Sequence, residues 1–489
     1  MKKNITLIGI LLFCVFACSP PTHDYTALGV EPDIYPDYAG VTIPPNIAPL
    51  NFELKDPHIE AYVLFSVAND SFRIKSKKGQ FHIPAKKWKN ILKTASGKTI
   101  DVSLRMKNDK GWGIFNSFNI TVAREPIDPY IAYRLIKPGY ELWHQMGIYQ
   151  RNLENYTESA IIENRITDNN CMNCHSFCMQ DPEQMLLHMR DKHAGTIFIQ
   201  NGKIEKINTK TDQTMSSLVY PSWHPSGKYV AFSVNLTNQS FHRNNRNRIE
   251  VYDSNSDVVV YDTENYKIIT SELLFDEKAF ETFPTFSPDG KTLYFCSADA
   301  QPMPQTYNEL RYSLCSISFD PATSTFGTQV DTLYNTRTQG GSVSIPRVSP
   351  DGNYLLYTLG DYGNFMIWHK EADLHMINLR TGEHYPLNKA NSQDVDSYHS
   401  WSSNSRWVVF SSRRGDGLYT RPYFAYIDDA GQAAKPFLLP QKDSEYYDRC
   451  MESYNVPEFI TGKVKQQARK ISLVARDSGN DITFAGKNF

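Results

Sequence analysis

The chain has 489 residues, which is enough for about three domains with cores of ordinary stability. Its 51 basic and 53 acidic residues leave a formal net charge of −2, which argues against a nucleic-acid partner and against a polybasic membrane-binding surface. Aromatic residues make up 13% of the chain, and Tyr and Phe recur in alternating runs that are typical of β-structure.

Residues 1–17 have the pattern of an export signal. Two lysines precede an apolar run, residues 5–16, that is too short to span a membrane as a helix. Residues 15–18 resemble a bacterial lipobox, in which the peptide is cut before the cysteine and that cysteine is lipidated. We therefore expect an exported chain that is anchored in a membrane by lipid at Cys18. Cys14 is a rival position, and secretion with a free cysteine is the other alternative.

The next segments are expected to be a tether and a small β-domain. Residues 18–48 are rich in Pro, Asp and Tyr without periodicity, as in a tether behind an anchored terminus. Residues 49–125 alternate between apolar and polar positions and contain polar turns, which predicts a β-sandwich of immunoglobulin-like type. Its expected strands are residues 51–54, 62–67, 99–106 and 117–122.

Residues 126–195 have helical texture, and helices are expected at 130–134, 140–150 and 181–192. Before the last of these, residues 171–175 form a C-x-x-C-H box. A segment this short cannot build a large core of its own, so a haem and a neighbouring domain would have to supply much of its buried surface.

The C-x-x-C-H spacing is typical of the attachment site of a c-type haem. Cys171 and Cys174, one helical turn apart, can each add to a porphyrin vinyl group, and His175 then follows as the proximal iron ligand. A C-x-x-C disulfide, half of a zinc site and coincidence are the alternatives. Zinc would need a second ligand pair nearby, and a thioredoxin-like site would need a βαβ context. The single box predicts one covalent haem c.

Several side chains near the box are candidates for the sixth iron position. We favour His188, which lies three residues from Met185 on one expected helix face. An open sixth position would instead favour a sensor or an enzyme. The alternative ligands are Met185, Met189, His193, His144 and Met146, while Arg190 and Arg151 are candidates for neutralising the haem propionates.

The segment from 196 to 475 repeats itself. Residues 221–232 recur as 284–295 and 346–357, and a degenerate copy follows at 400–410. Each copy is a strand, a turn of Pro-Asp-Gly type and an alternating strand. Together with later strands they make a unit of four strands, which predicts propeller blades.

These copies resemble the TolB-type propeller repeat, whose S-P-D-G-K core stands here at residues 287–291. The resemblance covers about residues 196–440 and implies a propeller of five or six blades, but it says little about function. The wider architecture resembles exported Gram-negative proteins that join a C-x-x-C-H segment to TolB-like repeats, which implies a lipoprotein at the outer membrane or facing the periplasm. The hairpin 196–208 and the chain after about Cys450 are expected to complete a closing blade, with a tail at 476–489.

Four cysteines remain after these assignments, and an even number in an oxidising compartment allows disulfides. Cys296 and Cys315 lie at the ends of neighbouring expected strands, where they can either form a bridge or stay as buried thiols. Cys178 and Cys450 are a second possible pair.

An Asn-rich insertion between blade strands carries Arg243, Arg246 and Arg248, which fit either an anionic ligand or a solvated loop. Residues 253–257 lack the Gly and the distant Glu of a calcium loop and are expected to form a hairpin turn.

The sequence contains no G-x-S-x-G, H-E-x-x-H or glycine-rich phosphate loop, so a classical enzyme is not favoured. The leading hypothesis is an exported mono-haem lipoprotein that carries electrons or senses redox state, with a protein partner docked on its propeller. The alternative is a TolB-like binding scaffold without a redox role. The third hypothesis is an oxidoreductase that uses the haem itself.

Overall fold

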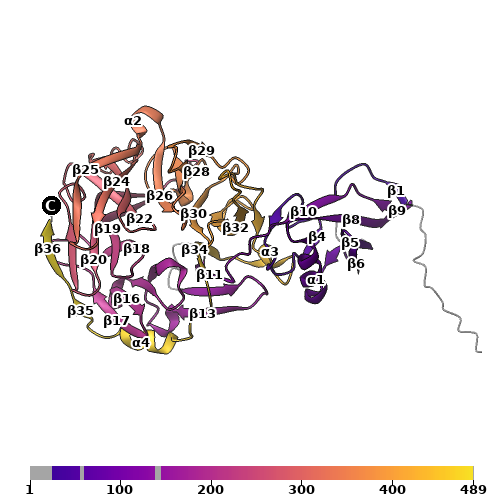
Figure 1. The fold of residues 1–489 in the computed structure, drawn as a ribbon, viewed down its shortest axis with the longest axis horizontal. Coiled ribbons are helices and arrows are strands. Elements are labelled where there is room, and N and C mark those ends of the chain that lie inside the picture. Colours follow the sequence, from indigo (N-terminus) through magenta and orange to yellow (C-terminus); the bar gives the residue numbers. More distant parts are fainter. Residues whose placement is uncertain (1–24, 56–59, 138–144, 488–489) are drawn as a thin grey trace, which may run out of the picture.

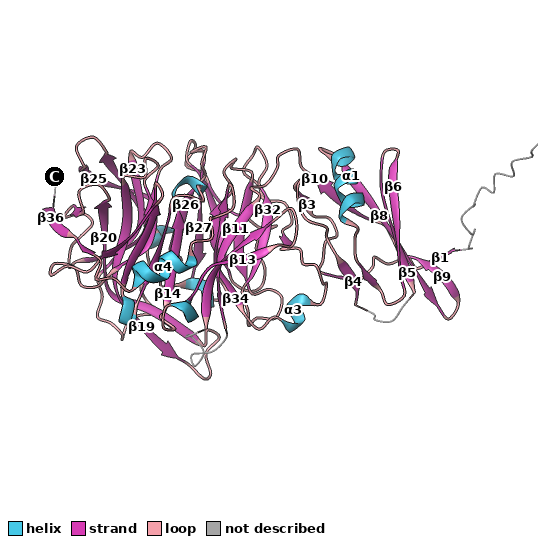
Figure 2. Cartoon of the chain, turned by 90° about the horizontal axis from the view of Figure 1, so that it is seen from below, coloured by secondary structure: helices cyan, strands magenta, loops and turns pink. Residues whose placement is uncertain are grey.

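The structure is a computed structural model that describes residues 25–55, 60–137 and 145–487. A β-rich N-terminal domain precedes a larger β-propeller, and the two lie side by side along the long axis (Figure 1). The all-β, multidomain class is confirmed. Strands dominate both bodies (Figure 2), and the longest α-helix in the described ranges has 11 residues. None of the described helices is long and apolar enough to cross a membrane.

The N-terminal domain is built on a seven-stranded sheet. Its central strand β8 (Thr99–Asn108) pairs antiparallel with β5 (Ala61–Val67), β9 (Gly111–Ile114) and β10 (Phe118–Val122), so the expected strands in this region are confirmed. The helix α1 (Ala85–Ala95), which the sandwich prediction lacks, buries Trp88, Ile91, Leu92 and Ala95. The other strands are β1 (Tyr25–Ala27), β2 (Ile34–Tyr35), β3 (Thr42–Ile43), β4 (Phe52–Leu54), β6 (Asp70–Ser76) and β7 (Gln80–Phe81).

The predicted tether, residues 18–48, is wrong from Tyr25 onward. The strands β1 and β3 pair parallel with β9 and β10, and Tyr38, Val41 and Ile43 are buried in the domain core. Strands of two or three residues show no periodicity in the sequence, and this is why the segment looked structureless.

The propeller has six blades, which decides between the five and six expected. In each blade the innermost strand contacts the innermost strands of its two neighbours, so that β14, β18, β22, β26, β30 and β34 form a closed ring. The blades are as follows in chain order: β11 (Tyr130–Ile136), β12 (Met146–Asn152) and β13 (Glu158–Glu163) with β34 (Ser453–Ile460); β14 (Met172–Phe177), β15 (Met185–Met189), β16 (Gly195–Gln200) and β17 (Lys203–Asn208); β18 (Leu218–Trp223), β19 (Tyr229–Phe241), β20 (Ile249–Asp262) and β21 (Lys267–Thr270); β22 (Ala279–Phe286), β23 (Thr292–Asp299), β24 (Ser313–Asp320) and β25 (Thr325–Tyr334); β26 (Ser342–Val348), β27 (Tyr354–Gly360), β28 (Asp373–Asn378) and β29 (His384–Pro386); β30 (Asp396–Trp401), β31 (Trp407–Ser412), β32 (Arg421–Tyr426) and β33 (Phe437–Leu438).

The prediction of a separate helical segment at 126–195 is wrong. The expected helices at 130–134 and 181–192 contain β11 and β15, and the described part of the expected helix at 140–150 lies in β12. Short apolar runs do not distinguish a buried strand from a helix by their periodicity. The propeller therefore begins at Tyr130, not at residue 196.

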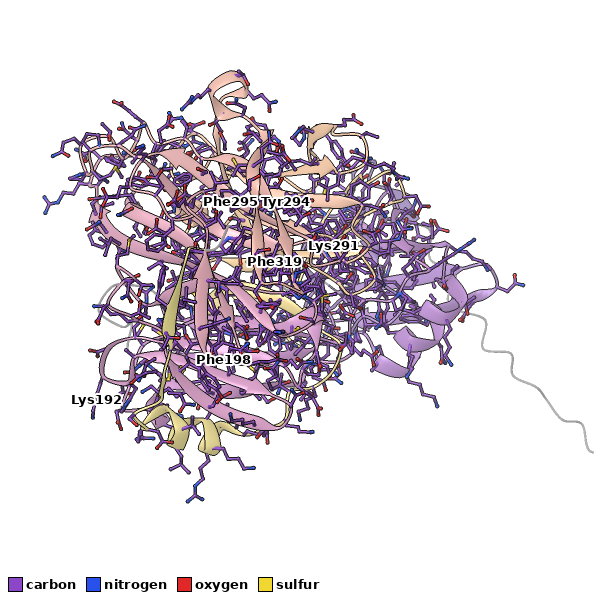
Figure 3. The ribbon with its side chains drawn as sticks, turned by 60° about the vertical axis from the view of Figure 1, so that its left-hand side comes forward. Lys192, Phe198, Lys291, Tyr294, Phe295 and Phe319 are labelled. Atoms are coloured by element: carbon purple, nitrogen blue, oxygen red, sulfur yellow. The ribbon has the colours of Figure 1, made fainter. Side chains whose placement is uncertain are left out.

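Aromatic and aliphatic side chains fill the space between neighbouring blades. Phe319, labelled in Figure 3, lies 5.4 Å from the ring of Phe286 and 5.3 Å from that of Tyr229, and so joins the fourth blade to the third. Phe198, also labelled, lies 5.7 Å from the ring of Trp223 and joins the second blade to the third. The blades are thus fixed to one another by buried ring contacts.

The four cysteines outside the box and the signal are free thiols. Cys296 pairs with Leu314 and Cys315 pairs with Phe295, so the two cysteines are offset by one residue and project from opposite faces of the blade. This register explains why no bridge forms between them. Cys178 is buried against the backbone of His224 and Cys450 lies beside Arg421, so that pair does not form either.

The C-terminal segment fastens the ring from outside. After β34 has closed the first blade, the helix α4 (Ala468–Ala475) leads to β35 (Asn480–Asp481) and β36 (Thr483–Lys487). These two strands add to the outer edges of the second and third blades (Figure 1). The expectation that the chain after Cys450 completes a closing blade is confirmed for β34, but the hairpin 196–208 belongs to the second blade as β16 and β17. The part of the expected tail that the structure describes, residues 476–487, is a structural strap. The remaining short helices are α2 (Thr336–Gln339) and α3 (Tyr446–Arg449).

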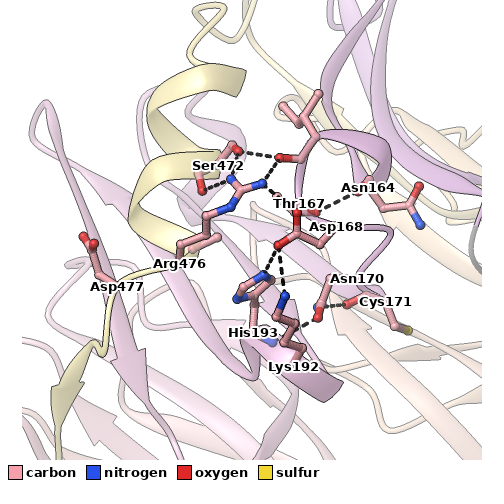
Figure 4. Close-up of polar contacts among 12 residues, drawn as sticks. Asn164, Thr167, Asp168, Asn170, Cys171, Lys192, His193, Ser472, Arg476 and Asp477 are labelled. Carbon is pink, nitrogen blue, oxygen red and sulfur yellow. Dashed lines mark hydrogen bonds and ion pairs between the residues drawn. The ribbon is translucent and has the colours of Figure 1, made fainter.

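Asp168 ties this strap to the first two blades (Figure 4). Its carboxylate accepts hydrogen bonds from His193 Nε2 at 2.8 Å and from an Arg476 guanidinium nitrogen at 3.1 Å. These contacts, the one from His193 foremost, lower the pKa of Asp168 to about 2. A carboxyl whose pKa is lowered on folding stabilises the fold above its unfolded pKa and loses that effect as the pH falls through the folded pKa.

We therefore expect Asp168→Asn to lower the protection of the amides in residues 468–487 at pH 7 below that of the parent protein. Protection is the exchange rate of an unfolded peptide divided by the rate that is measured in the protein. In the unchanged protein the same protection should decrease as the pH falls from about 4 to about 2. Asp477→Asn is the control, because the Asp477 side chain is exposed nearby on the strap (Figure 4). Equal exchange in the two variants would show that Asp168 does not hold the strap.

Candidate functional site

A cavity that includes the C-x-x-C-H box lies on the axis of the propeller. Its volume is about 490 Å³, and all six innermost strands contribute to its wall. Volumes in this range are typical of small-molecule and cofactor sites. Cys171, Cys174 and His175 all line it, so the C-x-x-C-H box belongs to the inner wall of the second blade.

Each innermost strand has one irregular position at the level of this cavity. There a non-glycine residue has a positive φ, from +33° at Cys174 to +51° at Val456, and the pairing with the next strand shifts. This conformation is strained for a residue with a Cβ. Because it recurs in all six blades, the bulge at Cys174 belongs to the blade geometry. The six residues are Cys174, Tyr220, Phe283, Ile345, Tyr398 and Val456, and all of them line the cavity.

The box is therefore also a copy of the blade repeat. The residue after the irregular position is proline in four blades and histidine in two, His175 and His399. His399 Nε2 is 3.0 Å from the carbonyl oxygen of Leu356 on the preceding blade. The carbonyl in the equivalent register position for His175 is that of Ala132. Yet the buried Nε2 of His175 makes no hydrogen bond of normal geometry within the described residues.

Burial determines the protonation of the box. It lowers the pKa of His175 to about 3, with a further contribution from Arg134, so the imidazole is neutral at neutral pH. Burial also raises the pKa of the Cys171 thiol, against the opposing effect of Arg134 and Arg190. A neutral imidazole can act as a ligand to iron through the ring nitrogen that carries no proton. Both thiols are free and half-buried.

The structure separates the candidates for the sixth iron position. His188 is buried on β15, its Nδ1 lies 3.1 Å from Thr196 Oγ1, and it is not part of the cavity wall. Met146 does line the cavity, next to the box, with its sulfur 3.3 Å from the Met172 amide nitrogen. His193 is hydrogen-bonded to Asp168. Met185 and Met189 are buried between the first two blades, while His144 and the lipidation candidate Cys18 lie outside the described residues.

One part of the cavity wall comes from a long β-hairpin. The strands β19 and β20 remain paired well beyond their blade, and Thr237, Gln239 and Val251 of this arm line the cavity. Glu250 fixes the arm to the fifth blade by accepting a hydrogen bond from Tyr362 at 2.6 Å and by contacting His369 at 2.9 Å.

The arm contains two segments that the sequence analysis singled out, residues 253–257 and the Asn-rich insertion. Residues 253–257 lie inside β20, so the expected hairpin turn there is wrong. The arginines of the Asn-rich insertion, Arg243, Arg246 and Arg248, lie exposed at the tip of the arm.

The remaining walls combine aromatic rings with positive charge. Arg134, Arg190 and Arg347 line the cavity, and Glu458 contributes the only carboxyl group among the lining residues of the described chain. Burial raises the pKa of Glu458 to about 7, so this carboxyl is partly protonated at neutral pH. No group of three or more His, Cys, Asp or Glu side chains in the described ranges is arranged to hold a metal ion directly.

Comparisons with known proteins add only a general likeness of fold. No family model and no curated protein matches the sequence. Among solved structures, the tricorn protease shares 13% identity with a TM-score of 0.35, covering 71% of this chain and 33% of its own. The β-propeller domain of the Trilobed protease from Pyrococcus furiosus shares 11% with a TM-score of 0.33, covering 80% and 98%. Prolyl oligopeptidase B from Galerina marginata shares 10% with a TM-score of 0.37, covering 69% and 42%. This chain thus spans a third of the tricorn protease and less than half of the oligopeptidase.

Proposed function

We propose that this chain is an exported propeller protein that carries one covalent haem c in its axial cavity and exchanges electrons, or senses redox state, with a docked protein partner. The supporting observation is that Cys171, Cys174 and His175 of a single C-x-x-C-H box all belong to the wall of one cavity, and that both of these thiols are free. A lipid anchor at Cys18 would hold the protein in a Gram-negative envelope.

The chemistry of these residues fits such a group, although their backbone differs from the expected one. The thiols would hold the porphyrin as thioethers, and Nε2 of His175, which makes no hydrogen bond of normal geometry within the described residues, would have to turn from the Ala132 and Val456 backbone to bind its iron. The haem would supply one-electron redox chemistry. Three residues span about 10 Å along a strand against about 5 Å along a helix. The bulge at Cys174 bends the strand and redirects this thiol, which helps both cysteines to reach one ligand.

A second candidate is a binding scaffold with a non-covalent ligand and no redox role. One observation favours it: His175, Ser176 and Phe177 match His399, Ser400 and Trp401 of the last blade, so the repeat alone accounts for most of the box. Only the two cysteines then need another explanation.

The test is expression together with the haem-attachment machinery, followed by a denaturing gel stained for haem. We expect stain at the full-length band in the unchanged protein and none in the Cys171→Ala/Cys174→Ala variant. Each single variant should keep one thioether, which shifts the pyridine haemochrome band. Cys178→Ala is the control, because this thiol is buried outside the cavity wall and should leave the stain intact. A colourless band after normal export would refute covalent haem and favour the scaffold.

A further inference from the structure

The cavity has an excess of positive charge that the described residues do not compensate. Arg134 and Arg190 line it, and neither forms an ion pair within the described residues. The single carboxyl among the described lining residues, that of Glu458, is close to Arg347 and accepts a hydrogen bond from the Phe177 amide at 3.1 Å. Over the whole sequence the net charge is −2, so this local excess is not a general property of the protein.

The two arginines flank the box. Both affect the Cys171 thiol electrostatically, and Arg134 also affects His175. One guanidinium nitrogen of Arg134 donates to the Met172 carbonyl and to Asn173 Oδ1, which orients the group, while its buried Nε has no hydrogen-bond partner among the described residues. An oriented guanidinium attracts carboxylates, because a hydrogen bond between two charged groups is about twice as strong as one between neutral groups.

The rest of the wall favours a flat apolar body. Aromatic side chains from the innermost strands of three blades and from the loop before β28 surround the cavity, and rings of this kind pack against the faces of planar ligands. These residues are Tyr220, Phe283, Phe365, Trp368, Tyr398 and Trp401.

We propose that Arg134 and Arg190 form a carboxylate-binding subsite beside Cys171, which holds the acidic side groups of a planar aromatic ligand in the axial cavity. This inference rests on the proposed function, where the ligand is haem and the acidic groups are its propionates. The same subsite would also select a free planar dicarboxylate if no covalent haem is attached.

The test uses two probes, protoporphyrin IX and its dimethyl ester, which differ only in the carboxylates. Binding is measured by fluorescence on the Cys171→Ala/Cys174→Ala protein, so that covalent attachment plays no part. We expect the free acid to bind at least about tenfold more tightly than the ester. Adding Arg134→Gln or Arg190→Gln should weaken the binding of the free acid by a similar factor and leave the binding of the ester unchanged. Arg469→Gln, an exposed arginine on α4, is the control.

A second readout uses the haem-loaded protein. Removing a positive charge next to the haem disfavours the added electron, so both arginine variants should lower the reduction potential while the haem stain persists. Equal binding of acid and ester, or arginine variants that bind the acid like the parent, would overturn the subsite even if covalent haem is present. Arginine-dependent binding of the acid to a protein that never stains for haem would support the subsite and refute the haem proposal.

Discussion

Trp407→Ala should cost about 3–5 kcal/mol of unfolding free energy, because it removes one of the two largest side chains from the core that the two bodies share. Trp407 is fully buried on β31, and its indole Nε1 donates to the Glu125 carbonyl at 3.2 Å, at the end of the N-terminal domain. Its ring lies 5.1 Å from that of Tyr426 and 6.4 Å from that of Phe437. One continuous cluster of buried residues joins this blade to the N-terminal sheet.

Urea unfolding followed by circular dichroism gives the measurement. Trp407→Phe keeps a ring but loses the hydrogen bond, so it should cost less than the alanine variant. Leu418→Ala, at a side chain that is 61% exposed, should stay within about 0.5 kcal/mol of the parent. A loss below about 1 kcal/mol for Trp407→Ala would mean that the two bodies do not share a core.

The repeats were predictable because their turn chemistry is strong. The Pro-Asp-Gly-type turns fall between the first and second strands of four blades, and the aligned positions Gly227, Gly290, Gly352 and Ser405 all have φ between +61° and +74°. The turn residues and alternating strands therefore located most of the propeller correctly.

The first two blades were predicted only in part because they lack this turn signal: the hairpin 196–208 and the chain after Cys450 were expected to form strands, but β11, β12, β14 and β15 were not. The first two blades share only a weaker sequence pattern with the other four blades. At the bulge of each innermost strand, an apolar or cysteine residue is followed by Pro or His. Cys174-His175 and Val456-Pro457 both have this pattern. The C-x-x-C-H spacing led us to interpret Cys174-His175 as a haem-attachment site instead of a blade strand. Val456-Pro457 stands far from any turn motif in the sequence. Closure by β34, some 300 residues from its partner strand β11, is a long-range pairing that no local pattern encodes.

The cavity could be predicted only in part. The box identified three of its residues, but the axial position, the arginine Arg134 and the aromatic wall depend on the arrangement of all six blades. His188 was favoured on the assumption of a helix, in which residues three apart share a face. On a strand, neighbouring side chains point to opposite faces, and Met146 is the candidate that reaches the cavity wall.

Gly290→Ala should destabilise the propeller far more than Gly352→Ala, although both glycines occupy the same turn in neighbouring blades. Their φ angles are +72° and +74°, so a Cβ adds about 1–2 kcal/mol of backbone strain at either position. At Gly352 the new methyl group would meet no atom within 4 Å. At Gly290 it would lie 2.0 Å from His224 Nε2, an overlap that requires the ring to move.

The His224 ring has little room to move. It is buried, its Nε2 lies 3.1 Å from the Gly290 carbonyl oxygen, and its neighbours include the ring of Phe286 at 5.0 Å. We therefore expect Gly290→Ala to cost about 1–3 kcal/mol more than Gly352→Ala in thermal or urea unfolding. Adding His224→Ala to both variants completes the cycle: it should remove most of the difference between them, because the clash disappears and the strain remains. Equal losses of unfolding free energy at the two glycines would show that the His224 ring moves aside at little cost. A difference that persists after His224→Ala would show that it arises from the turn backbone and not from the clash with the ring.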